Sequence, residues 1–255
     1  MKLPFLFFTL LVTVAILGEA TPAQSRKPLG LFKQAKPASS KSAEIGQSAI
    51  VVDETLSVLR KDPSLFAEAV HRMQRGRKVQ ILGIAEADGV RFYKVSAPPA
   101  NFGWVQSDAV FGKFRAGDEE RLAHLAQAAD GFDQIEIATQ FFGLFPDSKL
   151  KPALLLLFGD LLEEAAVRMS RDATTKLSRK EMAASAAPVH SYYLNFVSLD
   201  RYRKIGVMFV LNSALRQFHY DGASWKEIVA KFPSSPQATE ARARLDALRQ
   251  KMEQK

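Results

Sequence analysis

The sequence contains no cysteine among its 255 residues. Without thiols the chain cannot form disulfides, use a thiolate as a nucleophile, bind a metal through sulfur or carry a lipid on cysteine. Any folded domain must therefore be held together by packing. Hydrophobic residues make up 47% of the chain, which is enough apolar surface for one or two cores.

Histidine is also scarce, and its four positions are scattered through the sequence. They are His71, His124, His190 and His219, and Glu120 lies four residues before His124. The sequence has no HExxH, GxSxG, P-loop or dinucleotide-binding glycine pattern. We therefore predict no catalytic residues, no metal ligands and no cofactor, and we expect that the protein is not an enzyme.

The first twenty residues have the organisation of a secretory signal peptide. Lys2 supplies a positive charge, Leu3–Leu17 is an almost uninterrupted apolar run, and small residues end it at Gly18 and Ala20. A retained membrane anchor is the alternative, but the run is shorter than the roughly 20 residues that span a bilayer. We expect cleavage after Ala20 or Ala23 and a periplasmic or secreted protein.

The net charge of +8 is concentrated near the N-terminus. Residues 21–46 carry five basic side chains against one acidic residue, and they are rich in Lys, Ser, Ala and Pro. Such a segment buries too little apolar surface to offset its ordering entropy, so we expect a flexible basic linker. It is either a solvated spacer or a peripheral contact to anionic lipids or cell-wall polymers. The rest of the chain has no basic stripe interleaved with aromatics, so we predict no nucleic-acid partner.

Residues 47–115 have the pattern of short strands separated by turns. Apolar runs such as Ala49–Val52, Val79–Leu82 and Phe92–Val95 alternate with Gly, Pro and Asp residues, and Asp88-Gly89 is a turn signal. Several short strands in this order favour a small closed or partly closed barrel, because closure removes exposed edges.

The order of these elements resembles the bacterial SH3-like domain. The resemblance is carried by Leu56-Ser57-Val58, Val79–Leu82, Tyr93-Lys94-Val95 and the closing Gly103-Trp104-Val105. It implies a barrel with a groove lined by aromatic residues that accepts an extended ligand such as a cell-wall peptide. The segment 64–74 is longer than this family usually has.

In that longer segment Leu65, Ala69 and Met73 are four residues apart, which predicts a helical turn over the barrel.

Four aromatic residues are candidates for a ligand groove on the predicted barrel: Phe92, Tyr93, Phe102 and Trp104. Neighbouring residues of a strand point to opposite faces, so Phe92 and Tyr93 cannot both fill the barrel interior. Trp104 is assigned to the interior in preference to the groove. The outward-facing member of the Phe92–Tyr93 pair is then the better ligand-binding candidate.

Residues 116–255 change to a helical period. We expect helices over about 118–129, 132–145, 153–162 with extensions on both sides, 189–199, 202–219, 224–232 and 236–251, and a longer connection or weak helix over 172–188. The phrase Phe145-Pro146-Asp147-Ser148 recurs as Phe232-Pro233-Ser234-Ser235. This resembles the tetratricopeptide-like repeats of periplasmic proteins, which implies paired helices that present a concave surface to another protein.

Three residues beside the apolar helices are candidates for protein binding: Arg201, Tyr202 and Tyr220. Roles in helix capping and packing are the favoured alternative.

The predicted fold class is a multidomain chain, a small all-β SH3-like barrel followed by an all-α, helical-hairpin domain. The predicted function is an exported scaffold or adaptor that binds another envelope protein through its helices. The alternatives are a module that binds peptidoglycan peptides through the barrel, and a purely structural unit in which the barrel docks against the helices.

Overall fold

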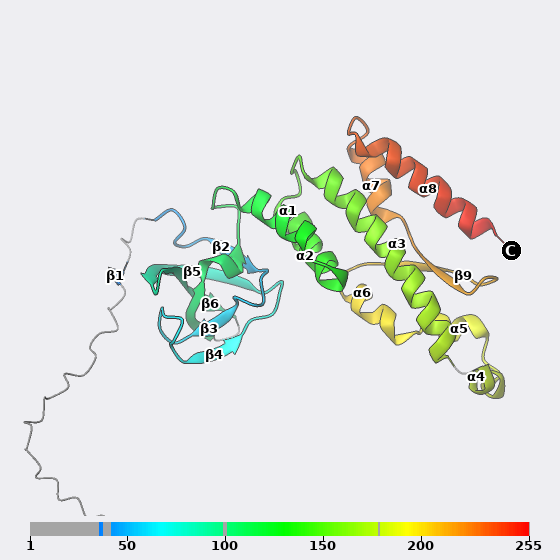
Figure 1. Cartoon of the computed structure of the whole chain (residues 1–255), viewed down its shortest axis with the longest axis horizontal. Helices are drawn as coiled ribbons and strands as arrows, with labels where there is room; N and C mark the ends of the chain where they lie inside the picture. The colour runs from blue at the N-terminus through cyan, green and yellow to red at the C-terminus, as the bar shows by residue number, and fades with distance from the viewer. Residues whose placement is uncertain (1–35, 38–41, 99–100, 178, 255) are drawn as a thin grey trace, which may run out of the picture. The chain divides into compact units, whose positions relative to one another are not determined.

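The computed structural model describes residues 36–37, 42–98, 101–177 and 179–254 (Figure 1). The chain divides into a segment that ends at Gln34 and one compact unit from Ala35 to Lys255. The predicted signal peptide and most of the predicted linker lie outside the described residues. Within the described part, no helix has both the length and the hydropathy needed to cross a membrane.

Seven strands between residues 48 and 111 form one antiparallel sheet, which we call the sheet region. They are β2 (Ser48–Val51), β3 (Val58–Arg60), β4 (Ala69–Arg72), β5 (Lys78–Ala87), β6 (Val90–Ala97), β7 (Asn101–Gln106) and β8 (Val110–Phe111). Their spatial order is β4-β3-β7-β6-β5-β2-β8, and β1 (Lys36–Pro37) pairs with β5 beside this path. A 3₁₀ helix, η1 (Ser107–Ala109), joins β7 to β8.

The sheet is open, so the prediction of an SH3-like barrel is wrong. Among the described residues β4 pairs with β3 alone and β8 pairs with β2 alone, which leaves these two short strands at opposite edges. β4 formed where a helical turn was predicted. A spacing of four residues fits two strand repeats as well as one helical turn, and Met73 reaches the core of the sheet.

Strand alternation explains which side chains fill this core. In β6, Tyr93, Val95 and Ala97 are buried on one face, and in β7, Val105 is buried on the same side. Tyr93 and Val105 are direct partners in the ladder between β6 and β7. The resulting cluster contains residues of every strand from β2 to β8 except β4, together with Met73, and is separate from the core of the helices.

Helices follow over residues 118–253, which we call the helical region. They are α1 (Asp118–Ala128), α2 (Gly131–Leu144), α3 (Lys151–Lys176), α4 (Arg179–Ser185), α5 (Val189–Leu194), η2 (Val197–Leu199), α6 (Asp200–Lys204), α7 (Ala223–Lys231) and α8 (Gln237–Glu253). The repeated Phe-Pro phrase follows α2 and α7, and Phe145 and Phe232 are the residues at which these helices end. α3 continues to Lys176, into the segment predicted as a connection.

The helical region is not all-α, which is a second correction to the predicted fold class. The predicted helix over 202–219 is a short α6 followed by a hairpin of β9 (Phe209–Asn212) and β10 (Gln217–Tyr220). Gly206 adopts a φ of 79°, a conformation that favours glycine and ends the helical path. The apolar residues after Gly206 then alternate as strands, with Phe218 and Tyr220 both buried in the helical core.

The sheet region and the helical region share contacts within the compact unit. Val52 and Phe111 of the sheet region belong to the same hydrophobic cluster as residues of α1, α2 and α3. Arg75, whose side chain is nearly buried, forms an ion pair with Glu136 of α2 at 2.7 Å and donates to the Val52 carbonyl at 3.0 Å. The boundary predicted at residue 115 is therefore crossed by both apolar and ionic contacts.

Candidate binding site

The four aromatic candidates of the sheet region do not form one groove. Phe92 and Tyr93 point to opposite faces, as strand alternation predicts, but both are fully buried. Phe102 is 61% exposed, and Trp104 is half-buried on the same face of β7. Phe102 and Trp104 are thus the accessible members of the predicted set, and Tyr93 belongs to the core.

Trp104 lies in a cross-strand row between two cations. Arg60 is its ladder partner on β3, and Lys94 is its partner on β6. In the next row Phe102 is opposite Ser96, and Leu82, at the irregularity of β5, is 40% exposed. This outer face of the sheet therefore combines exposed apolar groups with positive charge.

A loop between β3 and β4 is fastened to the turn between β5 and β6. Asp88 accepts hydrogen bonds from the Ser64 hydroxyl at 2.7 Å and from the Leu65 N–H at 2.8 Å. Arg60 donates to the Ala67 carbonyl at 2.8 Å, which holds the other side of the loop. Phe66, at the centre of this loop, is 78% exposed.

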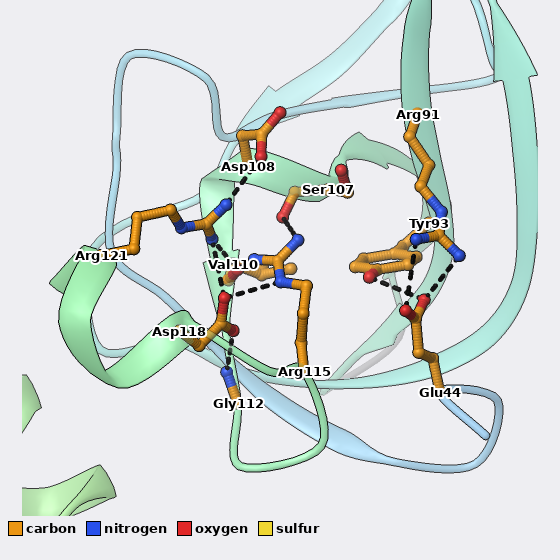
Figure 2. Close-up of polar contacts among 10 residues, drawn as sticks. All are labelled: Glu44, Arg91, Tyr93, Ser107, Asp108, Val110, Gly112, Arg115, Asp118 and Arg121. Carbon is orange, nitrogen blue, oxygen red and sulfur yellow. Dashed lines mark hydrogen bonds and ion pairs between the residues drawn. The ribbon is translucent and has the colours of Figure 1, made fainter.

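On the opposite, buried face of the sheet, the Tyr93 hydroxyl forms a hydrogen bond with a charged side chain (Figure 2). The hydroxyl donates to Glu44 Oε2 at 2.8 Å, and Glu44 also forms an ion pair with Arg91 at 2.9 Å. Burial, followed by the hydrogen bond to Glu44, raises the pKa of Tyr93 to about 12. This tyrosine is a packed, neutral residue rather than an ionisable site.

A second polar cluster in Figure 2 joins the end of the sheet to the start of α1. The buried carboxylate of Asp118 accepts from the Gly112 N–H at 2.9 Å and from Arg115 Nε at 2.7 Å, and Arg121 lies 3.3 Å away. Arg115 also donates to the Val110 carbonyl at 2.7 Å. The Asp118 carboxylate and the Arg115 guanidinium are paired within the chain, so the cluster is a structural connection.

The three residues predicted to bind protein on the helical region are mostly internal. Tyr202 is buried between the rings of Phe132 and Phe209, each with its centroid 5.1 Å away. The Arg201 guanidinium stacks over Phe132 and Tyr202. Packing accounts for Tyr202, and the exposed Arg201 lies against the two rings.

Tyr220 is also buried and lies against α7. Its hydroxyl accepts a hydrogen bond from the Ser224 N–H at 2.7 Å, and its ring is 5.5 Å from that of Trp225. Trp225 in turn lines a cavity of about 280 Å³ between α3, α7 and α8. The cavity is lined by Asp160 and Glu163 from α3, Trp225 from α7, and Arg244, Ala247, Leu248 and Lys251 from α8.

The rim of this cavity is made of ion pairs between α3 and α8. Arg244 Nε lies 2.9 Å from Asp160, and Lys251 Nζ lies 2.7 Å from Glu163. The apolar part of the lining comes from Ala247, Leu248 and the buried Trp225. The site therefore offers a small apolar hollow edged by charges that neutralise each other.

Glu163 connects this rim to the β9–β10 hairpin. One carboxylate oxygen lies 2.9 Å from His219 Nδ1 as well as close to Lys251, and the other accepts from the Tyr220 N–H at 2.9 Å. Burial alone would raise the pKa of Glu163, but these three hydrogen bonds outweigh it and lower the pKa to about 2. Glu163 is therefore a fixed anion and not a proton donor at neutral pH.

The position of Trp225 against α3 depends on Gly159, which has no side chain. A Cβ placed on Gly159 would lie 2.2 Å from Trp225 Nε1, so only glycine lets the indole lie against α3. Trp225 Nε1 is buried and has no hydrogen-bond partner among the described residues. Helix propensity disfavours glycine here, so close packing is the reason for this residue.

Sequence reasoning did not find Asp160, Glu163, Arg244 or Lys251. The available signal was a pair of acids three residues apart within the most apolar helical stretch, where charges are costly unless they have partners. No group of three or more His, Asp or Glu side chains in the described ranges is placed to hold a metal ion. No family model, curated protein or solved structure matches this chain.

Proposed function

We propose that this chain is an exported, non-enzymatic scaffold that binds another protein of the cell envelope through its helical region. The observation that supports the proposal is the cavity between α3, α7 and α8, with its partly apolar lining and ion-paired rim. Export is supported by Lys2 and the apolar run Leu3–Leu17.

The dimensions of the cavity favour a side chain as its occupant. A volume of about 280 Å³ is at the small end for a site that encloses a separate small molecule. One large apolar side chain inserted into a desolvated hollow and surrounded by polar groups is the common form of an interface anchor. The partner would therefore present an exposed Leu, Met or aromatic residue to the apolar lining formed by Ala247 and Leu248.

Site-specific photo-crosslinking in cells tests this function. A photoreactive residue at Ala247, which lines the cavity, should form a discrete adduct with one envelope protein. The matched control is Ala243, one turn earlier on α8, exposed and outside the cavity lining. Equal adducts from both positions, or none from Ala247, would contradict binding at this cavity.

A second candidate function is binding of peptidoglycan peptides on the outer face of the sheet. It is supported by the exposed Phe102 and by Trp104 between Arg60 and Lys94, because carboxylates of a cell-wall peptide would meet both cations. Sedimentation with purified peptidoglycan tests it. Phe102→Ala should abolish co-sedimentation, whereas Phe66→Ala, on the more exposed loop, should leave it unchanged.

A further inference from the structure

One end of the helical region carries most of its positive charge. We call residues 176–216, from the last turn of α3 to the loop of the β9–β10 hairpin, the basic end. It has seven basic and two acidic residues, whereas the rest of the helical region has eleven basic and sixteen acidic residues. Within the basic end, α4 and α5 lie beside the C-terminal end of α3, and α5 contacts β9 (Figure 1). The charge of the helical region is therefore strongly asymmetric.

The basic end also concentrates exposed apolar side chains. It contains five of the eight large hydrophobic side chains that are exposed in the described part of the helical region: Val189, Leu194, Val197, Met208 and Leu215. Val197 is the most exposed of them, at 72%. Such side chains contribute little to the fold, and their concentration at one place is typical of an interaction surface.

The continuous segment formed by η2 and α6 directs apolar and charged side chains to solvent together. Leu199 and Tyr202 are buried on its inner side. Since each helical residue turns by about 100°, Val197, Asp200 and Lys204 lie on the side opposite Tyr202. The most exposed apolar residue of the basic end therefore shares a face with a lysine.

Two cations of the basic end are available to bind an anion, and a third joins α6 to α5. Lys204 and Arg216 are exposed and form no ion pair with a described residue. Arg203 pairs with Asp200 at 3.1 Å and donates to the Leu194 carbonyl, so the end of α5 lies beside α6. The single acidic residue of this outward face is thus already neutralised, and the lysine charge remains.

We propose that the basic end binds the surface of a bilayer that contains anionic phospholipids. Its cations pair with lipid phosphates, and the exposed aliphatic side chains of Leu194 and Val197 insert at the level of the headgroups. Lysine and arginine side chains are long enough to reach the phosphates past these apolar neighbours. The proposal does not depend on the proposed function, which concerns the cavity between α3, α7 and α8.

Charge complementarity favours a lipid surface as the occupant. The basic end is attracted to an anionic surface, whereas the rest of the helical region has a net negative charge and is repelled, so the field orients the chain. The exposed apolar side chains come from separate places, namely α5, η2 and the hairpin loop. A fluid headgroup layer accommodates such separate side chains, whereas a protein partner would need a matching pocket for each.

Sedimentation with vesicles tests the proposal in the purified chain from residue 21 onward. The protein should sediment with vesicles made of equal parts of phosphatidylglycerol and phosphatidylcholine, should not sediment with phosphatidylcholine alone, and should be released by salt. Lys204→Glu should weaken this binding at least about fivefold. The matched control is Lys149→Glu, the same change at an exposed lysine before α3, which should weaken it less than about twofold.

The absence of cysteine allows a second test at a single labelled position. Val197→Cys carrying a polarity-sensitive fluorophore should shift its emission to shorter wavelength when the anionic vesicles are added. Leu150→Cys is the control, because it is 38% exposed and the 26 residues of α3 separate it from the end of α3 by about 39 Å. Its emission should not change. This test keeps the native charges, so it decides the question if Lys204→Glu does not fold.

Four outcomes would overturn the proposal. The first is no sedimentation with the anionic vesicles, and the second is equal sedimentation with phosphatidylcholine alone. The third is unchanged binding of Lys204→Glu, which would assign the contact to the basic residues of 21–46. The fourth is an equal emission shift, or none, at Val197→Cys and Leu150→Cys. Soluble polyphosphate that binds as tightly as the vesicles would likewise show that a bilayer is not what the basic end recognises.

Discussion

The sheet region and the helical region both bury large aromatic residues with a polar end, and Tyr93 and Trp225 differ in whether that end has a hydrogen-bond partner. The Tyr93 hydroxyl in the sheet region bonds to Glu44 at 2.8 Å. In the helical region, Trp225 Nε1 has no partner among the described residues, and the ring lines a cavity. Tyr93 thus follows the usual rule that buried polar groups are hydrogen-bonded, whereas Trp225 is an exception among the described residues and lies in the wall of a cavity.

The largest expected effect is that of Gly159→Ala. The new Cβ would lie within 2.2 Å of the Trp225 ring, and neither the α3 backbone nor the buried indole can yield cheaply. We expect the free energy of unfolding to fall by about 3 kcal/mol, measured by urea denaturation. Gly143→Ala in α2 is the control, because nothing lies near its Cβ, and it should stabilise the protein slightly. Equal effects would contradict the close approach.

Asp118→Asn tests the polar connection between the sheet and α1. The buried carboxylate accepts hydrogen bonds from the Gly112 N–H and from Arg115. Removing the charge should lower the free energy of unfolding by about 2 kcal/mol, because hydrogen bonds to charged groups are the stronger ones. Asp108→Asn, at a carboxylate that pairs with Arg121 but is 57% exposed, should cost less than about 0.5 kcal/mol. A similar loss in both variants would contradict the larger contribution to stability expected of the buried Asp118 carboxylate.

Glu163→Gln should remove a pH-dependent part of the stability. The pKa of Glu163 is lowered from 4.5 to about 2 in the folded protein, so its stabilisation is present above pH 4.5 and is lost as the pH falls toward 2. Unfolding by urea at pH 5 and at lower pH should show a smaller decline for Glu163→Gln than for the wild type. Glu164→Gln, at the adjacent exposed position, should decline like the wild type. Parallel curves for all three proteins would refute this role.

Tyr93→Phe should have the smallest effect of the four. The ring remains packed, and only the hydrogen bond to Glu44 is lost, so we expect a decrease of about 1 kcal/mol in the free energy of unfolding. Tyr192→Phe is a control, because its hydroxyl makes no hydrogen bond to the described residues. If both variants unfold like the wild type in guanidinium, the Glu44 contact contributes nothing measurable.

Local patterns in the sequence predicted the strand-then-helix order and most of the helix positions. They could not predict whether the sheet closes or stays open. Closure depends on whether β4 and β8 meet, and these strands are far apart in sequence. They also misassigned residues 209–220. Apolar residues there are compatible with a helical spacing, and only the pairing of β9 with β10 distinguishes the two structures.

The candidate site was less predictable than the fold. Alternation within β6 correctly placed Phe92 and Tyr93 on opposite faces, yet both are buried, because burial depends on what covers each face. The cavity joins residues from α3, α7 and α8 that are up to 91 positions apart, from Asp160 to Lys251. No local spacing rule connects such residues.

The sequence by itself determined the absence of thiol chemistry, the concentration of positive charge in residues 21–46 and the change of period near residue 116, because these are properties of composition and of neighbours along the chain. Only the tertiary structure decided that the sheet stays open, that α3, α7 and α8 line a cavity and that, within the described part of the chain, β9 pairs with β10 alone. The physical reason is that hydrogen-bond satisfaction and burial are set by groups distant in sequence.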